Sequence, residues 1–233
     1  MKLFKNKKKL CKEIKSFKNV GFVPTLGTLH RGHEALIKKS IKISNKTLVS
    51  LFLNPKQFEN KKDFKNYPKN YKNDIKILKK LKVDYVYMPN YRDVYKFKTK
   101  NKIILDKFSK KLCGKHRKGH FHGVIDVVNR FLEIIKPKKI LLGHKDFQQL
   151  VLIKKHIKKN KIKTTVIPCK TVRDKNFIAY SSRLKKLKTQ EKNNPVKIIK
   201  HLKYYKRYLI LNKKMNINFL EIKNKLLTLG VKK

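Results

Sequence analysis

Two histidines stand three residues apart in the segment Pro24–His33 (PTLGTLHRGH), where a short apolar stretch is followed by glycines. His30 and His33 share one face at the start of a predicted helix, because residues three apart are neighbours on a helix surface. Gly27 and Gly32 allow a ligand to approach the backbone closely, and the N–H groups at a helix start favour phosphate. The segment therefore predicts a site where two imidazoles stabilise charge on the phosphates of a nucleotide. A capped helix with two surface histidines is the alternative.

A second segment, Val49–Phe58 (VSLFLNPKQF), ends an apolar run in polar side chains. Asn54 and Gln57 can each donate and accept hydrogen bonds, so they suit a hydroxyl or carboxylate group of a substrate. An ordinary Asn-Pro turn is the alternative for this segment alone.

Two later segments again pass from a predicted strand into a predicted helix. They are Arg117–Val124 (RKGHFHGV) and Leu142–Leu150 (LGHKDFQQL). Lys145 could place a cation on an ATP phosphate, and Gln149 on the opening turn could hold a small substrate. Lys145 is one of 57 lysines, so its setting beside Gly143 and the two glutamines is what singles it out.

The fifth segment, Val172–Arg183 (VRDKNFIAYSSR), brings two hydroxyls next to an arginine. Ser181, Ser182 and Arg183 form a plausible clamp for triphosphate oxygens. A basic linker that contains two serines is the alternative.

Taken together, the five segments resemble the pantothenate synthetase family in their order and approximate spacing. The first motif is similar to the H-x-G-H signature that nucleotidyltransferases share with class I aminoacyl-tRNA synthetases. The second, V-S-x-F-x-N-P-x-Q-F, is followed by Asp63 and Tyr67-Pro68, and it points to this family specifically. The resemblance implies ATP-dependent condensation of pantoate with β-alanine through a pantoyl adenylate, releasing AMP and pyrophosphate. A different adenylyl- or cytidylyltransferase is disfavoured, because it does not need the Asn54–Gln57 and Gln148-Gln149 motifs.

The resemblance also implies roles for single residues. It makes His33 the expected proton donor with His30 as its partner, and Lys145 the cation that acts on ATP. The residues expected to hold pantoate are Gln57, also assigned to β-alanine, and Gln149, with Asn54 in support. The expected ATP-binding residues are Leu26, Gly27, Thr28, Leu29, His30, Arg31, Gly32, His33, Gly143, His144, Lys145, Asp146, Val172, Tyr180, Ser181, Ser182 and Arg183. We expect Mg²⁺ to be carried by the ATP phosphates, with no dedicated metal site in the protein.

Several positions depart from the family pattern. Phe177 replaces a glycine in the turn that leads to Ser181-Ser182, where a glycine could matter to the backbone. The second domain is also short, so we expect a lid that is less stable or closes differently, with reduced activity as a consequence. The other departures are Leu26, Cys113, Lys118, His144, Asp174 and Leu184.

The elements that must position these motifs alternate between strand and helix. Apolar runs predict strands at 19–24, 47–53, 83–88, 139–142 and 164–168. Helical spacing predicts helices at 30–44, 70–81, 119–135, 147–159, 195–211 and 216–229. Such alternation predicts an α/β fold with a Rossmann-like, doubly wound parallel sheet over residues 1–171, with ligands at the carboxyl ends of the strands. Residues 172–233 are expected to form a small, shortened C-terminal lid domain of α+β or helical type.

The composition bounds the remaining possibilities. The chain has 233 residues and no apolar stretch that approaches a membrane span, so a cytoplasmic enzyme without a membrane partner is expected. The three cysteines have no CxxC spacing and predict neither a disulfide framework nor a zinc site. The family habit suggests a homodimer.

The net charge of +50 raises a nucleic-acid-binding protein as the competing hypothesis. However, 57 of the 64 basic residues are lysine, and they are spread along the chain rather than gathered in one segment. Arginine is the residue usually used for specific phosphate and base contacts. We therefore expect nonspecific adhesion to RNA and no specific nucleic-acid partner.

Overall fold

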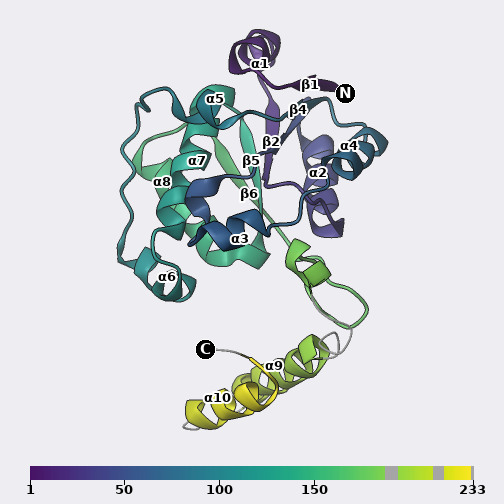
Figure 1. Ribbon diagram of the computed structural model, residues 1–233, viewed down its shortest axis with the longest axis vertical. Coiled ribbons are helices and arrows are strands. Elements are labelled where there is room, and N and C mark those ends of the chain that lie inside the picture. Colours follow the sequence, from purple (N-terminus) through teal and green to yellow (C-terminus); the bar gives the residue numbers. More distant parts are fainter. Residues whose placement is uncertain (187–193, 212–217, 232–233) are drawn as a thin grey trace. The chain divides into compact units, whose positions relative to one another are not determined.

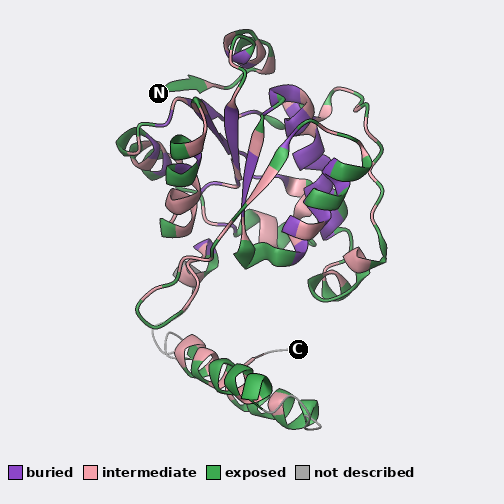
Figure 2. Ribbon diagram, turned by 180° about the vertical axis from the view of Figure 1, so that it is seen from behind, coloured by how far each residue is buried: buried purple, intermediate pink, exposed green. Residues whose placement is uncertain are grey.

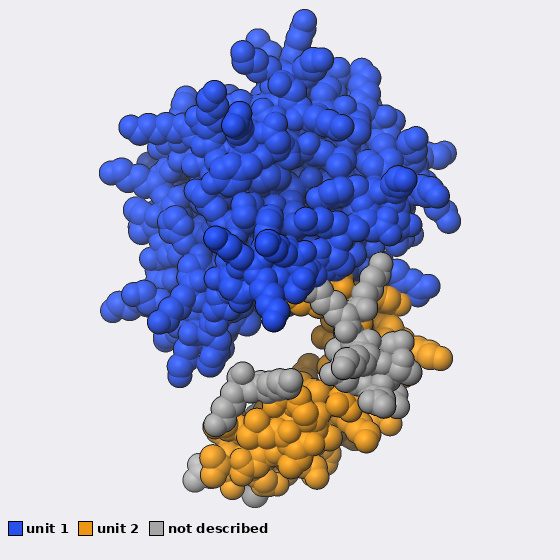
Figure 3. Space-filling model, viewed as in Figure 1, with its two compact units in different colours: residues 1–172 blue, residues 173–233 orange. Residues whose placement is uncertain are grey.

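The computed structural model describes residues 1–186, 194–211 and 218–231 (Figure 1). The chain divides into two compact units, Met1–Val172 and Arg173–Lys233, which are coloured separately in Figure 3.

The first unit is built on one sheet of six parallel strands. Their order is β1-β4-β3-β2-β5-β6, so the chain steps outward in one direction from β2 and then in the other. This arrangement confirms the predicted α/β fold with a doubly wound parallel sheet. The strands are β1 (Lys2–Phe4), β2 (Val20–Thr25), β3 (Lys46–Leu51), β4 (Tyr85–Tyr87), β5 (Lys139–Gly143) and β6 (Thr165–Cys169).

Helices cover both faces of this sheet (Figure 1). One apolar cluster joins one face of the sheet to α1, α5, α7 and α8, and a second joins the other face to α2 and α4. The helices are α1 (Lys7–Ile14), α2 (Arg31–Ile43), α3 (Lys61–Lys65), α4 (Tyr71–Lys80), α5 (Tyr91–Tyr95), α6 (Cys113–His116), α7 (His120–Ile135) and α8 (Phe147–Lys159). Three single 3₁₀ turns lie between them, at η1 (Pro55–Gln57), η2 (Lys107–Lys110) and η3 (His144–Asp146).

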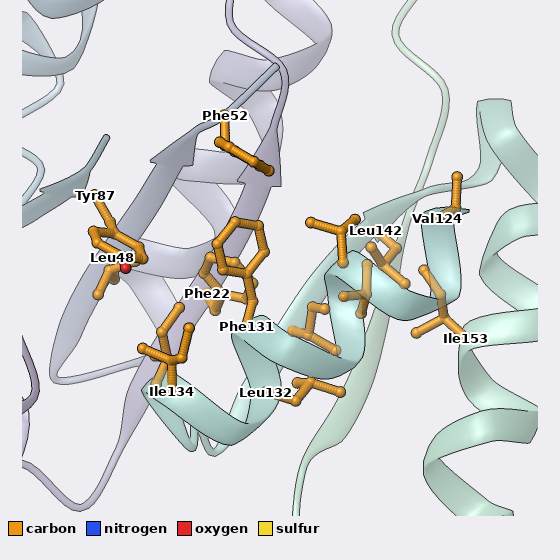
Figure 4. Close-up of a cluster of buried hydrophobic side chains, with 14 of the residues drawn as sticks. Phe22, Leu48, Phe52, Tyr87, Val124, Phe131, Leu132, Ile134, Leu142 and Ile153 are labelled. Carbon is orange, nitrogen blue, oxygen red and sulfur yellow. The ribbon is translucent and has the colours of Figure 1, made fainter. Parts of the chain in front are cut away.

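Helix α7 is the central helix of the larger cluster and is buried along almost its whole length (Figure 2). Its Phe131 ring makes edge-to-face contacts, with centroid distances of 5.6 Å to Phe22, 5.9 Å to Phe52 and 6.1 Å to Tyr87 (Figure 4). Aromatic pairs in this geometry each add about 0.5–1.5 kcal/mol beyond the area that they bury. The packing therefore anchors α7 to the middle of the sheet.

The first strand and helix were not predicted from the sequence. Strand β1 has only three residues and pairs with β4 at the edge of the sheet. In α1, Leu10 and Ile14 are buried one helical turn apart, but four lysines surround them in an eight-residue helix. Two apolar positions are too few to give a clear helical period.

Strand β2 contains a proline that affects its pairing. On one side β2 pairs with β3 as far as Thr25, which lies opposite Leu51. On the other side, within the described residues, pairing with β5 ends at Phe22. Pro24 has no N–H with which to extend a ladder. Strands β2 and β5 therefore part before their carboxyl ends, at the point where the strand order reverses and doubly wound sheets bind ligands.

The edge strand β6 also contains a proline. Strand β6 pairs in parallel with β5, and its Pro168 lies opposite Leu142. Pro is tolerated at such an edge, because one side of the strand needs no partner.

The described part of the second unit is mainly helical. It contains η4 (Ser182–Lys186), α9 (Asn194–Leu211) and α10 (Phe219–Thr228), with one isolated antiparallel bridge between Arg173 and Ala179. Both predicted helices are therefore present, although residues 216 and 217 of the second one lie outside the described residues. In the part of the chain that the structure describes, none of the helices combines the length and the apolar character needed to cross a bilayer.

A tight turn precedes the Ser181-Ser182 pair. The carboxylate of Asp174 accepts hydrogen bonds from the backbone N–H groups of Asn176 and Ile178, both at 2.9 Å. Phe177, where the resemblance implies a glycine, adopts a left-handed backbone with φ of 64°. A non-glycine residue in this region is strained by about 1–2 kcal/mol.

We expect Phe177→Gly to be more stable than Phe177→Ala by about 1 kcal/mol, because both variants lose the ring and only alanine keeps the strain. Urea unfolding followed by circular dichroism measures the difference. The controls are Asn176→Gly and Asn176→Ala, because the φ of Asn176 is not positive. Here the alanine variant should be the more stable one, since glycine adds entropy to the unfolded chain. Equal stability of the two Phe177 variants would contradict the strain.

Candidate active site

The loop between β2 and α2 positions the histidine pair. His30 is the N-cap of α2, and its Nδ1 accepts a hydrogen bond from the Gly32 N–H at 3.1 Å. This bond fixes the tautomer that carries hydrogen on Nε2. The two imidazoles stack with centroids 4.0 Å apart, as their spacing predicts. The pair therefore forms one rigid surface at the helix start.

His33 is neutral at physiological pH in this arrangement. Burial, together with the electrostatic influence of the neighbouring His30 and Lys145, lowers its pKa to about 3. Its buried Nδ1 has no hydrogen-bond partner among the described residues. A neutral imidazole can donate a hydrogen bond to a phosphate, but it becomes an acid only if an anion raises its pKa.

A buried aspartate on α4 shapes the same loop. The Asp74 carboxylate is fully buried and accepts the backbone N–H groups of Thr28 at 2.8 Å and Leu29 at 2.7 Å. Gly27 turns the chain with φ of 90°, and a Cβ there would lie 3.1 Å from Asp74. The N–H groups of Thr28 and Leu29 are thus engaged within the protein, so these two residues shape the loop. Sequence reasoning missed Asp74, although it lies in the first turn of a predicted helix.

The loop after β3 carries the predicted amides. Asn54 is fully buried, and its side chain is hydrogen-bonded within the protein. Its Nδ2 donates to the Gly123 carbonyl at 3.1 Å and to Gln57 Oε1 at 3.3 Å. Gln57 itself is half-buried at the end of η1. The structure therefore joins the two predicted amides by a direct hydrogen bond.

The N-terminus of α7 holds this loop from one side. His120 Nδ1 lies 2.7 Å from the Gln57 carbonyl, and its Nε2 lies 2.9 Å from Arg117 Nη1. Because a carbonyl only accepts and a guanidinium only donates, the hydrogen of His120 is on Nδ1. A Cβ on Gly123 would lie 2.1 Å from the Lys56 carbonyl oxygen, so this close approach requires glycine.

The loop after β5 supplies the predicted cation. Lys145 is exposed in η3, its Nζ lies 3.2 Å from Asp146, and its charge reaches His33. Gln149 is half-buried on the first turn of α8. Its neighbour Gln148 is buried and donates to the carbonyls of Phe108 and Lys111, so Gln148 is structural. Gly143 is half-buried, and His144 and Asp146 are exposed.

The remaining predicted ATP-binding residues lie at or beyond the end of the first unit. Val172 is its last residue. In the second unit Tyr180 and Ser181 are half-buried, Ser182 is buried and Arg183 is exposed. The Arg183 N–H donates to Ser181 Oγ at 3.3 Å. Leu26 and Gly32 are half-buried and Arg31 is exposed in the first loop.

Three of the five motifs thus follow β2, β3 and β5, which are neighbours in a parallel sheet. The carboxyl ends of parallel neighbours share one edge, so the histidine pair, Gln57 and Lys145 converge there. Hydrogen bonds add the α7 motif to the β3 loop.

Comparison with known proteins agrees with this geometry. The profile of the family described as Pantoate-beta-alanine ligase matches residues 2–230. The chain belongs to the pantoate–β-alanine ligase family. The chain is 39% identical to the pantothenate synthetase of Pseudothermotoga lettingae over 196 residues, covering 84% of this chain and 70% of that protein. It is 39% identical to that of Endomicrobium trichonymphae over 230 residues, covering 95% of this chain and 81% of that protein.

A solved structure of the ligase family is similar over nearly the whole chain. The pantoate-β-alanine ligase of Francisella tularensis, complexed with βγ-ATP and β-alanine, superposes with a TM-score of 0.87 at 36% identity. The match covers 99% of this chain and 86% of that one.

Within the described residues, no group of three or more His, Cys, Asp or Glu side chains is placed to hold a metal ion. Both oxygens of Asp74 already accept backbone N–H groups.

The lowered pKa of His33 predicts a pH dependence of stability. The unfolded chain binds more protons than the folded one between about pH 6.5 and 3, so the contribution of His33 is present above pH 6.5 and lost as the pH falls. One proton accounts for at most about 1.4 kcal/mol per pH unit. We expect His33→Gln to lose less unfolding free energy than the wild type between pH 7 and pH 4.5. Urea unfolding at both pH values tests this, with the exposed His116→Gln as the matched control; identical slopes for wild type and His33→Gln would refute it.

The close approach at Gly123 gives a second prediction. We expect Gly123→Ala to lower the unfolding free energy by about 1–3 kcal/mol, because the added methyl forces α7 away from the η1 turn. Gly143→Ala is the control, since a Cβ there meets its nearest atom at 3.9 Å without a positive φ. Urea unfolding of both variants compares them, and equal stabilities would show that the turn relaxes freely.

Proposed function

We propose that the protein condenses pantoate with β-alanine, using ATP, to form pantothenate, AMP and pyrophosphate. The observation that carries the proposal is the convergence of the histidine pair, Lys145 and Gln57 at one edge of the sheet. The family match over residues 2–230 and the ATP and β-alanine named with the Francisella tularensis structure support it.

In the first step a pantoate carboxylate oxygen forms a bond to the α-phosphorus of ATP. The bond between the α-phosphorus and the bridging oxygen breaks, and pyrophosphate leaves. Lys145 supplies positive charge to the phosphates, and His30 and His33 donate N–H hydrogen bonds to them. The negative triphosphate offsets the nearby cations and raises the pKa of His33, which then suits its role as proton donor.

In the second step the amine of β-alanine attacks the acyl carbon of pantoyl adenylate. The bond to the phosphate oxygen breaks, AMP leaves, and the nitrogen releases its proton to solvent. Gln57 and Gln149 hold pantoate and Gln57 also meets β-alanine, while Asn54 fixes Gln57. No covalent bond to the protein is required, so positioning and charge stabilisation supply the catalysis.

The remaining parts of the proposal concern the wider setting. Residues 172–233 serve as a lid whose Tyr180–Arg183 segment binds ATP phosphates, and Leu26–His33 with Gly143–Asp146 bind ATP from the first unit. Mg²⁺ binds through the phosphates of ATP. The working form is a cytoplasmic homodimer. Sedimentation of the purified protein can test whether it is a dimer.

We expect AMP release only when Mg-ATP, pantoate and β-alanine are all present. His33→Ala and Lys145→Ala should each lower kcat/KM by at least about a hundredfold, because each removes a group that stabilises transition-state charge. The matched controls are His116→Ala and Lys154→Ala, which change exposed side chains outside the site. Absence of AMP with all three substrates, together with absence of pyrophosphate exchange with pantoate alone, would refute the function.

A further inference from the structure

A cluster of charged and aromatic side chains lies behind the Asn54–Gln57 turn. We call Tyr95, Lys56, Asp126 and Arg130 the Tyr95 cluster. The Lys56 ammonium lies 4.2 Å and the Arg130 guanidinium 4.7 Å from the centroid of the Tyr95 ring. Asp126 pairs with both cations, at 3.5 Å to Lys56 and 2.8 Å to Arg130. Lys56 is itself part of the turn, so the cluster holds the turn from its reverse side.

The cluster also fixes the position of α5. Arg130 Nη1 donates to the carbonyls of Phe97 at 2.8 Å and Val94 at 3.2 Å, which flank Tyr95 in the chain. Its side chain is largely buried, as is that of Asp126. Bonds of a buried, ionised pair are stronger and shorter than neutral ones. These bonds therefore hold the Tyr95 hydroxyl in a fixed position.

That hydroxyl meets the side chain of Asn54. Tyr95 Oη lies 2.8 Å from Asn54 Oδ1. The backbone fixes which end of the amide is oxygen, because the Lys56 N–H can only donate to Oδ1 and the Gly123 carbonyl can only accept from Nδ2. Tyr95 must consequently donate. Burial, and then the nearby Asp126, raise the pKa of Tyr95, so the hydroxyl keeps its proton across the working pH range.

The orientation of the Asn54 amide also determines the orientation of the Gln57 amide. Asn54 Nδ2 donates to Gln57 Oε1 at 3.3 Å, so the group that Gln57 presents to a ligand is its Nε2. An amide nitrogen can bind a carboxylate or hydroxyl oxygen and cannot accept from an ammonium.

We propose that Tyr95 is a positioning residue which, through Asn54, holds the Gln57 amide nitrogen toward an oxygen of the acid substrate. The inference rests on the proposed function and deepens it. It assigns Gln57 to oxygen acceptors of pantoate, or to the carboxylate of β-alanine, and never to the β-alanine ammonium. Tyr95 touches no substrate itself.

The test is a double-mutant cycle between Tyr95→Phe and Gln57→Ala. We expect Tyr95→Phe to raise the KM for pantoate about fivefold to tenfold, the loss typical of one hydrogen bond, while the KM for ATP changes less than twofold. We call the chain of hydrogen bonds from Tyr95 through Asn54 to Gln57 the relay. In the Gln57→Ala background the same substitution should change the KM for pantoate less than twofold, because the relay then lacks the amide that binds pantoate. The matched control is Tyr91→Phe on the same helix, whose ring is exposed and stacks on Tyr95.

Three results would overturn the assignment. One is an unchanged KM for pantoate in Tyr95→Phe. Another is an equal rise in the KM values for ATP and pantoate, which would indicate a general loss of structure. The third is full additivity with Gln57→Ala, which would mean that Tyr95 and Gln57 act independently.

A readout that needs no turnover separates this inference from the proposed function. The side-chain amide NMR resonances of Asn54 and Gln57 should shift in Tyr95→Phe and stay in place in Tyr91→Phe. If the wild type neither binds pantoate by calorimetry nor turns over, the proposed function fails, while shifted resonances would still support the relay. Unshifted resonances refute the relay in either case.

Discussion

The missing side chain of Gly123 is the constraint on which the substrate half of the site depends. A Cβ at this position would overlap the Lys56 carbonyl, so only glycine lets α7 lie directly against the η1 turn. That contact permits the Asn54–Gly123 bond and brings His120 to the Gln57 carbonyl. The helix that carries these residues is fixed in turn by its burial against the sheet. The packing of the core therefore determines the position of the Asn54–Gln57 turn.

The acidic residues are few, and the structure uses several of them at decisive places. The chain has 14 acidic and 64 basic residues. Asp74 accepts hydrogen bonds from two backbone N–H groups of the loop between β2 and α2, and Asp126 forms ion pairs with Lys56 and Arg130. Asp84 likewise binds the Lys46 ammonium and the Thr47 N–H beside the central strands. Replacing Asp74 leaves two buried backbone donors without partners, which is more damaging than losing a surface ion pair.

Much of the first unit could be predicted because its signals are local. The apolar run of β3 and the helical spacing of α7 mark buried elements, and the histidine pair stacks as its spacing indicates. The supporting residues could not be predicted in the same way. Asp74, Tyr95 and His120 act on partners 41 to 63 residues away in the chain, through single hydrogen bonds. Such contacts depend on tertiary packing and leave no periodic pattern. The N-terminal strand and helix could not be predicted for a simpler reason. Strand β1 has only three residues and none of them is buried, and helix α1 has only two buried positions among its lysines.

Pro168 has a consequence for how copies of the protein meet one another. An outer strand with unpaired N–H and C=O groups is a template onto which another chain can add a strand, the first step of edge-to-edge aggregation. Strand β6 is such an outer strand, and Pro168 removes one of the donors that an added strand would need. Lys163 and Lys170 flank β6, so an approaching copy also brings like charges together. The proline that β6 tolerates at the edge of the sheet thus helps to keep the sheet six strands wide.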